Sequence, residues 1–150
     1  MPRLSLESPV GRLTIFEEDG KLTALDWGGK SSGQATPLLL EAKRQLTAYF
    51  AGKRQVFELS LAPAGSPFEL RVWQLMSDIP YGETRSYGEL AHDLGGVPRA
   101  VGQACGRNPL PIIIPCHRVL GAGGAIGGYS GRGGADTKRK LLILEGALLV

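Results

Sequence analysis

The residues with the clearest chemical potential are Cys116 and His117, in the stretch Pro115-Cys116-His117-Arg118-Val119. A thiol becomes a strong nucleophile at neutral pH once a neighbouring base takes its proton. Consecutive side chains of a strand point to opposite faces, so adjacency alone does not make His117 the base for Cys116. A tight turn at Pro115 or a bridging water would join the two. A cysteine that follows the apolar residues 112–114 can also simply be buried.

Glu145 is a candidate third member of this group. It stands at the carboxyl end of an expected helix over residues 137–144, where the helix dipole disfavours a carboxylate. An acid in such a position often has a partner elsewhere, and His117 is the natural candidate. In a Cys-His-Glu relay the acid would fix the imidazole tautomer and stabilise its charged form. A frayed, solvent-exposed Glu145 remains the alternative.

Length and composition set the frame for these residues. A chain of 150 residues with 43% hydrophobic and 21% charged residues is typical of a soluble protein with one domain or two small lobes. No apolar run approaches the roughly 20 residues that span a bilayer, and no signal peptide follows Met1. Cys105 and Cys116 make no disulfide framework, so we expect a cytoplasmic protein without a membrane partner.

Metal ligands are scarce, whereas basic residues are concentrated. His92 and His117 are the only histidines, and residues 1–91 hold neither Cys nor His, so we expect no metal site. Between positions 94 and 140 one acidic residue, Asp136, stands against seven basic ones: Arg99, Arg107, Arg118, Arg132, Lys138, Arg139 and Lys140. Such a field suits a polyanion, although a solvated charged face is common.

Residues 1–65 are expected to form an N-terminal structural lobe. Broken alternation around Asp19-Gly20 predicts a hairpin within residues 4–27, Pro37 opens a helix to about Phe50, and residues 55–61 alternate like one more strand. A connector over residues 62–65 ends this lobe. The predicted fold class is α+β: a small α/β lobe with a short antiparallel sheet, followed by a mainly helical lobe.

Residues 66–150 are expected to form the second lobe. Capping boxes beginning at Ser66 and Ser86 predict two helix starts, and Pro98 opens a third helix to about residue 105. The second and third helices are joined by Gly95-Gly96, which predicts a helix-turn-helix. Residues 121–134 hold eight glycines, which predicts a loop that bends sharply or approaches a ligand. Asp136 is expected to cap the last helix.

The helix that begins near Pro98 carries three kinds of side chain. An apolar set at four-residue spacing should face the core: Val97, Val101 and Cys105. A polar set should face outward: Arg99, Gln103 and Arg107. The remaining residues are small and would let the helix approach a groove wall closely: Ala100, Gly102 and Ala104. Ordinary solvent exposure of the polar set is the alternative, and Cys105 is expected to be inert packing.

Six motifs recur in the order of a known family. They are Ile79-Pro80-Tyr81-Gly82-Glu83-Thr84, Ser86-Tyr87, Arg99-Ala100-Val101-Gly102, Asn108-Pro109, Pro115-Cys116-His117-Arg118-Val119 and Gly128-Tyr129-Ser130-Gly131. On these residues the chain closely resembles the O6-alkylguanine-DNA alkyltransferases, from about residue 68 to residue 146. The link between Leu94 and Arg99 looks about two residues shorter than in some relatives, and residues 132–136 look longer by about two.

The resemblance implies how DNA would be bound. Such proteins bind duplex DNA through the minor groove with a helix-turn-helix and rotate the damaged nucleotide out of the stack. Arg99 would fill the gap left by the extruded base. The small residues Ala100 and Gly102 would suit a narrow groove, and Gln103 and Arg107 would contact the DNA.

The resemblance also implies the reaction. Cys116, deprotonated through a water by His117 with Glu145 behind it, would attack the alkyl carbon of O6-alkylguanine, and of O4-alkylthymine as well. Further roles would fall to Tyr87 as proton donor to the departing guanine, to Asn108 as a brace of the turn, and to the pocket residues Val119, Tyr129 and Ser130. The product is a thioether, so a monomer would act once and need no cofactor.

Three other interpretations stay open. A non-catalytic lesion sensor would keep the DNA-binding frame but lack the nucleophile, which Cys116 argues against. A Cys-His-Glu hydrolase would turn over repeatedly and would have no use for Arg99 beside small residues. A transcription regulator that uses only its helix-turn-helix would leave the Cys-His-Arg motif idle.

Overall fold

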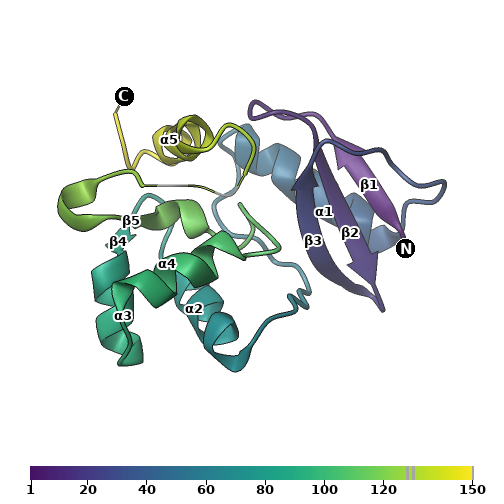
Figure 1. Cartoon of the computed structure of the whole chain (residues 1–150). Helices are drawn as coiled ribbons and strands as arrows, with labels where there is room; N and C mark the ends of the chain where they lie inside the picture. The colour runs from purple at the N-terminus through teal and green to yellow at the C-terminus, as the bar shows by residue number, and fades with distance from the viewer. Residues whose placement is uncertain (128, 130, 150) are drawn as a thin grey trace. The chain divides into compact units, whose positions relative to one another are not determined.

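The computed structural model describes residues 1–127, 129 and 131–149 (Figure 1). The chain divides into two compact units, Met1–Ala64 and Gly65–Val150. A three-stranded antiparallel sheet and the helices α1 to α5 make this an α+β fold, which confirms the predicted class.

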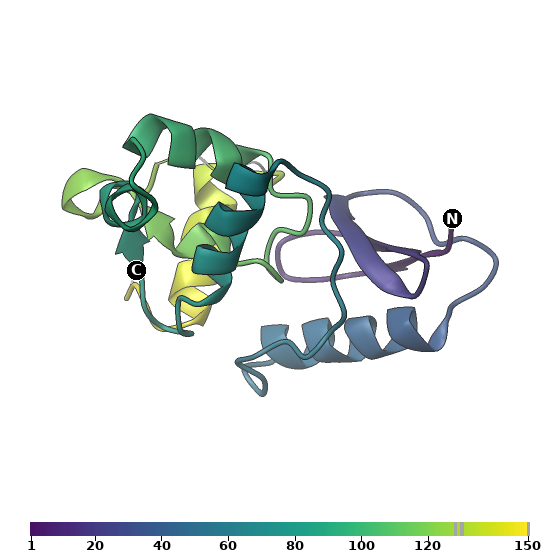
Figure 2. The ribbon, with the colours of Figure 1, turned by 90° about the horizontal axis from the view of Figure 1, so that it is seen from below.

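The N-terminal unit is built on a sheet in the order β1-β2-β3, with β1 at Arg3–Leu6, β2 at Leu13–Glu18 and β3 at Lys21–Trp27. The predicted hairpin is β2 and β3. Its turn residues Asp19 and Gly20 have φ angles of 52° and 76°, the left-handed geometry that matches the twist of paired strands. Helix α1, Pro37–Phe50, lies along the sheet (Figure 2) and buries Leu39, Leu46 and Tyr49.

The strand predicted over residues 55–61 is wrong. Only Leu61 pairs there, in an isolated bridge with Leu22 of β3. The buried side chain of Gln45 instead takes the place of a strand partner: its Oε1 accepts from the Glu58 amide at 2.9 Å, and its Nε2 donates to the Glu58 carbonyl at 3.1 Å. The side chain of a helix residue thus satisfies the backbone amide and carbonyl of Glu58, which would pair with a neighbouring strand if residues 55–61 formed one.

The described part of the C-terminal unit holds the α-helices α2 at Pro67–Ser77, α3 at Tyr87–Leu94, α4 at Pro98–Gly106 and α5 at Ala135–Leu144. Both predicted capping boxes are formed, by Ser66 with Glu69 and by Ser86 with Glu89. Helix α3 ends at Gly95 with a φ of 65°, and α4 packs against both α3 and α2. The indole nitrogen of Trp73 donates to the α4 carbonyl of Ala104 at 2.8 Å.

Two local predictions in this unit are wrong. Asp136 does not cap α5, because the helix begins at Ala135 after Gly134 and has no side-chain cap. Val97 does not face the core. It is the N-cap residue of α4 and is 60% exposed, since a residue outside the helix does not follow the helical face. Val101 and Cys105 are buried as predicted.

Candidate active site

Cys116 begins a short 3-10 helix, η1, at Cys116–Arg118, which leads into the strand β5 at Val119–Leu120. The side chain is buried, and its backbone amide donates to the Ile114 carbonyl at 2.8 Å. Strand β5 pairs in parallel with β4, Arg85–Ser86, directly before α3. Because Cys116 and His117 lie on a tight turn, the alternation of a strand does not separate their side chains.

Asn108 holds the turn that precedes this cysteine. Its Nδ2 donates to the Ile114 carbonyl at 2.8 Å, and its Oδ1 accepts from the Leu110 amide at 2.9 Å. Ile112 between them has a φ of 76°, which is costly for a β-branched residue. The buried amide therefore stabilises a strained turn, the bracing position that the resemblance implies for Asn108.

His117 and Glu145 form a buried pair. Nε2 of His117 lies 2.7 Å from Oε2 of Glu145, and both side chains are fully buried. Glu145 is the C-cap of α5 and is not frayed. An ionised carboxylate only accepts, so the pairing places the imidazole proton on Nε2. Nδ1 is buried and bonds to no described residue, which leaves its lone pair available as a base.

Arg118 is a member of this network that the sequence analysis missed. Its Nε and one terminal nitrogen donate to Oε1 and Oε2 of Glu145 at 2.8 and 3.0 Å, and the other donates to the Ile79 carbonyl at 2.6 Å. Its guanidinium also lies 5.8 Å from the centre of the Tyr81 ring. Glu145 is therefore shared between an imidazole and a guanidinium. The only sequence signal was an arginine directly after the Cys-His pair.

Burial sets the protonation states of the thiol and the imidazole. It raises the pKa of Cys116 to about 11, against smaller opposing effects of a hydrogen bond from Asn108 and the charge of Lys138. Burial also lowers the pKa of His117, although Glu145 opposes this shift. At neutral pH the site therefore holds a neutral thiol and a neutral imidazole, so the thiol must lose its proton during the reaction.

Tyr87 and Lys138 meet beside this network. Tyr87 is the first residue of α3, and burial, followed by the nearby Cys105 and Cys116, raises its pKa to about 12. Lys138 of α5 is fully buried, its Nζ 3.5 Å from the Tyr87 hydroxyl and 5.6 Å from the ring centre. In the sequence Lys138 belongs to a basic stretch expected at the surface, so its burial was not predicted.

The residues expected to line a pocket are placed in part. Val119 is fully buried in β5, and Tyr129 is half-buried. Burial raises the pKa of Tyr129, and the nearby Cys116 and Glu145 contribute to the same shift. Ser130 lies outside the described residues.

The outward face of α4 carries the polar residues expected there. Arg99, Gln103 and Arg107 are exposed, and Arg107 pairs with Glu69 of α2 at 3.5 Å. Ala100 and Gly102 are partly exposed, and a Cβ added at Gly102 would meet no atom within 4 Å. Packing inside the protein therefore does not require glycine at this position.

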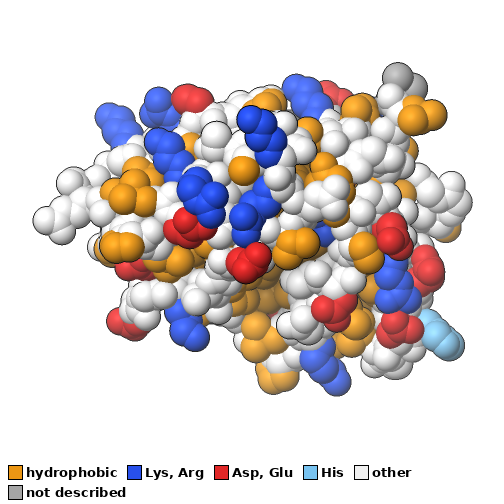
Figure 3. Space-filling view, turned by 180° about the vertical axis from the view of Figure 1, so that it is seen from behind, with side chains coloured by type: hydrophobic (Ala, Val, Ile, Leu, Met, Phe, Trp, Pro, Cys, Tyr) orange, Lys and Arg blue, Asp and Glu red, His pale blue; other side chains and the backbone are white. Residues whose placement is uncertain are grey.

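The basic stretch is only partly a surface feature. Arg118 and Lys138 are buried, whereas the other five basic residues are exposed: Arg99, Arg107, Arg132, Arg139 and Lys140. The face drawn in Figure 3 carries acidic side chains among its basic ones. Among the described residues, no group of three or more His, Cys, Asp or Glu could hold a metal ion. No helix in the described part of the chain is long and apolar enough to cross a membrane.

The C-terminal unit of this α+β fold thus holds a buried cysteine next to a paired histidine and glutamate, the residue types of a protein that reacts through a thiol. Two family models then divide the chain between them. Residues 3–63 match the ribonuclease-like domain of 6-O-methylguanine DNA methyltransferase, and residues 67–147 match its DNA binding domain. The chain therefore belongs to the 6-O-methylguanine DNA methyltransferase family.

Individual relatives match over nearly the whole chain. The constitutive methylated-DNA–protein-cysteine methyltransferase of Bacillus subtilis is 46% identical over 152 residues, covering 93% of this chain and 90% of its own. The methylated-DNA–protein-cysteine methyltransferase of Methanosarcina acetivorans is 53% identical over 151 residues, which cover 94% of this chain and 96% of that protein. The crystal structure of Mycobacterium tuberculosis OGT in complex with DNA aligns with a TM-score of 0.86 at 45% identity, covering 97% and 92%.

Proposed function

We propose that this protein repairs DNA by transferring a methyl or other alkyl group from O6-alkylguanine to Cys116. The observation that carries the proposal is the buried His117–Glu145 pair directly beside the cysteine of a Pro-Cys-His-Arg turn. The names of the relatives, methylated-DNA–protein-cysteine methyltransferases, support the same reaction. O4-alkylthymine presents a similar alkyl–oxygen bond and is a second substrate of this proposal.

The nucleophile is made during the reaction. Nδ1 of His117 takes the thiol proton of Cys116 through a bridging water, because Glu145 occupies the other ring nitrogen. As the sulfur–carbon bond forms, the carbon–oxygen bond breaks and its electron pair goes to the guanine. Tyr87 donates its hydroxyl proton to the guanine, which makes it a better leaving group.

The product limits the protein to one turnover. The carbon–sulfur bond of a thioether has no good leaving group, so the transfer is not reversed. The alkyl acceptor is Cys116 itself, so the proposed reaction uses no cofactor. Repair is therefore stoichiometric, one lesion for each protein molecule.

DNA binding falls to α3 and α4, which we assign as a helix-turn-helix that enters the minor groove. Gly102 supports this assignment, since glycine costs a helix roughly 1 kcal/mol relative to alanine and no internal contact demands it. The exposed Arg99 enters the stack in place of an extruded nucleotide, while Gln103 and Arg107 contact the strand. Val119 and Tyr129 are assigned to the pocket that receives the flipped base.

The proposed setting is a monomer in the cytoplasm. Cys116, His117, Glu145 and Tyr87 all come from one chain, so the site needs no second copy. Cys105 and Cys116 are both free thiols, which suits a reducing compartment.

The test is intact-protein mass after incubation with duplex DNA that contains O6-methylguanine. We expect a gain of about 14 Da, mapped to Cys116 by peptide analysis, and no gain in Cys116→Ala. Cys105→Ala is the matched control and should gain the same mass, because Cys105 is packed against Met76 with its sulfur 3.3 Å from that of Met76. Unmodified protein beside repaired DNA would overturn the proposal and favour a hydrolase. Binding without any reaction would favour a lesion sensor.

A further inference from the structure

Arg107 has an acidic partner that its proposed contact with DNA does not explain. Nη1 of Arg107, at the carboxyl end of α4, lies 3.5 Å from Oε2 of Glu69 in α2. Arg99, on the same outward face of α4, forms no ion pair with any described residue. Because a carboxylate repels phosphate, an acid beside Arg107 acts against the binding of a polyanion.

Glu69 is held in place at the amino end of α2. Its Oε1 accepts from the Ser66 amide at 2.9 Å, and its own amide donates to the Ser66 hydroxyl at 3.1 Å. A Cβ added at Gly65 would lie 3.2 Å from the same Oε1. One carboxylate oxygen is therefore bound within the capping box, while the other faces Arg107. The Glu69 side chain is only 14% exposed, against 74% for Arg107.

The carboxylate of Glu69 is ionised at neutral pH. The hydrogen bond from the Ser66 amide lowers the pKa of Glu69, and the neighbouring Arg107 adds to the same shift. The two helix ends are also tied together, because the indole nitrogen of Trp73 in α2 donates to the Ala104 carbonyl of α4 at 2.8 Å. Arg107 can therefore leave this charge only by moving its own side chain.

We propose that Glu69 limits the affinity of the protein for DNA by competing with the phosphate backbone for Arg107. In the free protein Arg107 pairs with Glu69, and on bound duplex DNA a phosphate takes the place of the carboxylate. The proposal rests on the proposed function, in particular on the assignment of α4 to DNA, and it gives a residue of α2 a part in setting the affinity. Because phosphate contacts carry no sequence information, the limit applies to undamaged DNA as well.

Three variants test the competition. Glu69→Gln removes the charge at nearly constant shape, and glutamine also completes a capping box, so the variant should fold as wild type does. Asp78→Asn removes the same charge from the exposed C-cap of α2 and is the matched control. Ser66→Ala breaks the capping box but keeps the charge of Glu69. Fluorescence anisotropy with a labelled undamaged duplex at fixed salt measures each dissociation constant, after circular dichroism has confirmed the fold.

We expect Glu69→Gln to tighten binding by about two- to five-fold, the range by which an exposed ion pair shifts an equilibrium. Asp78→Asn should change the dissociation constant by less than about 1.5-fold, since a distant charge is screened by salt. Ser66→Ala should not tighten binding. The gain in Glu69→Gln should shrink as the salt concentration rises.

A second background identifies the partner. Arg107→Gln alone should weaken binding, because a phosphate contact is lost. Adding Glu69→Gln to Arg107→Gln should bring no further gain, since no arginine is left for the carboxylate to hold. A gain that persists without Arg107 would mean that Glu69 repels DNA directly, which overturns the competition.

Other outcomes also overturn the proposal. Weaker binding by Glu69→Gln would mean that the carboxylate positions Arg107 for DNA, and an equal gain in Asp78→Asn would reduce the effect to net charge. A gain in Ser66→Ala would assign the effect to the helix end. A wild-type protein that binds no duplex DNA and never methylates Cys116 would instead refute the proposed function. Normal wild-type binding and transfer, with Glu69→Gln binding as wild type does, refutes only this inference.

Discussion

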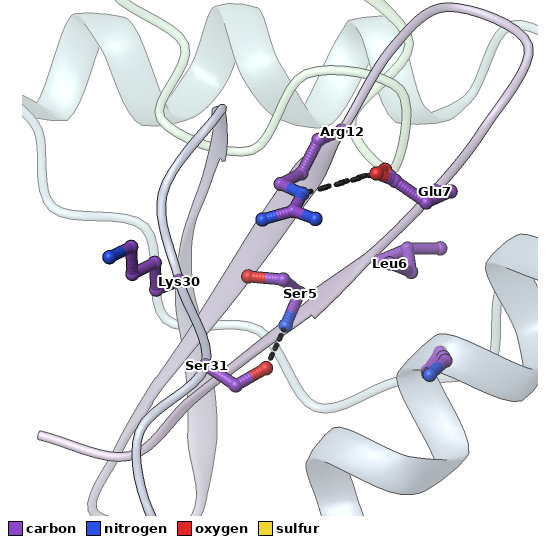
Figure 4. Close-up of a pocket in the computed structure, with 7 residues that line it drawn as sticks. Ser5, Leu6, Glu7, Arg12, Lys30 and Ser31 are labelled. Atoms are coloured by element: carbon purple, nitrogen blue, oxygen red, sulfur yellow. Dashed lines mark hydrogen bonds and ion pairs between the residues drawn. The ribbon is translucent and has the colours of Figure 1, made fainter.

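The two units of the molecule differ in where their charged side chains lie. In residues 1–64, all of which the structure describes, the buried polar side chains are Thr14 and Gln45, and no charged one is buried. The ion pair of Arg12 with Glu7 has side chains that are 49% and 69% exposed. Figure 4 shows this pair at an open pocket of about 280 Å³, also lined by Ser5, Ser31 and Lys30. Charge in this unit is a surface property.

Among its described residues, the C-terminal unit buries four ionisable groups in addition to its cysteines: His117, Arg118, Lys138 and Glu145. A buried ion pair rarely stabilises a fold more than well-packed apolar side chains would. The proposed reaction uses two of these buried groups, His117 and Glu145, while the N-terminal unit shows no comparable arrangement. This contrast predicts that equivalent substitutions will have very different effects in the two units.

Glu145→Ala and Glu7→Ala give the sharpest form of this comparison. Removing Glu145 leaves Arg118 buried without its carboxylate partner, so we expect a loss of about 3–5 kcal/mol in the free energy of unfolding. Removing Glu7 breaks an exposed pair and should cost about 0–1 kcal/mol. Urea titration of the two variants beside wild type measures both values. Similar losses would remove the distinction between the units.

Arg99→Ala tests an exposed charge assigned to DNA rather than to the fold. Arg99 is exposed, so its loss should change stability by less than about 0.5 kcal/mol. We expect transfer from duplex DNA to slow by about 10- to 100-fold, because an unstacked base without a replacement costs a few kcal/mol. Reaction with free O6-methylguanine base should be nearly unchanged. Equal losses on both substrates would contradict a flipping role for Arg99.

Much of the fold was predictable because its signals are local. A capping box lies within four residues, so the capping boxes at Ser66 and Ser86 correctly predicted the starts of α2 and α3. Position at a helix end likewise singled out Glu145 as a partner for His117. The failed strand over residues 55–61 involves a partner further away in sequence, because the side chain of Gln45 pairs there with the backbone of Glu58.

Arg118 and Lys138 show the same limit within the site. Residue type predicts exposure for arginine and lysine, and nothing in the neighbouring residues contradicts that expectation. Their burial follows from the packing of α5 against η1 and from the contact of α5 with Tyr87. The candidate nucleophile could thus be proposed from a short motif, whereas the buried charges near it required the folded chain.

Gly102→Ala separates the needs of the fold from those of binding at one position. An added Cβ would meet no atom of the protein within 4 Å, so alanine should raise the free energy of unfolding by about 0.5–1 kcal/mol through helix propensity. The methyl group should weaken binding of duplex DNA if α4 lies close to a groove wall. Thermal unfolding and a binding titration measure the two effects. A stabilised variant that binds DNA as well as wild type would place the contact elsewhere.

The smallest expected effect is the pH dependence of transfer, and it tests burial of His117 directly. The thiol of Cys116, with a pKa of about 11, stays protonated below pH 8, so His117 is the member of this pair that titrates there. Burial lowers the pKa of His117 from 6.5. Glu145 opposes this shift, whereas the charges of Arg118 and Lys138 add to it. The neutral, basic form of His117 therefore persists as the pH falls through 6.5. Between pH 7.5 and 5.5 the single-turnover rate should therefore fall by less than the about ten-fold that an unshifted imidazole would lose.

The same shift makes the fold less stable in acid. Below pH 6.5 the unfolded chain binds a proton at His117 that the folded chain does not yet bind, so this residue's contribution to stability falls as the pH falls. The rates must therefore be measured well below the melting temperature at each pH, with folding followed by circular dichroism. A ten-fold loss by pH 5.5 in fully folded protein would show that the imidazole behaves as if exposed. The contrast between a unit with buried charges and a unit with surface charges would then not hold for His117.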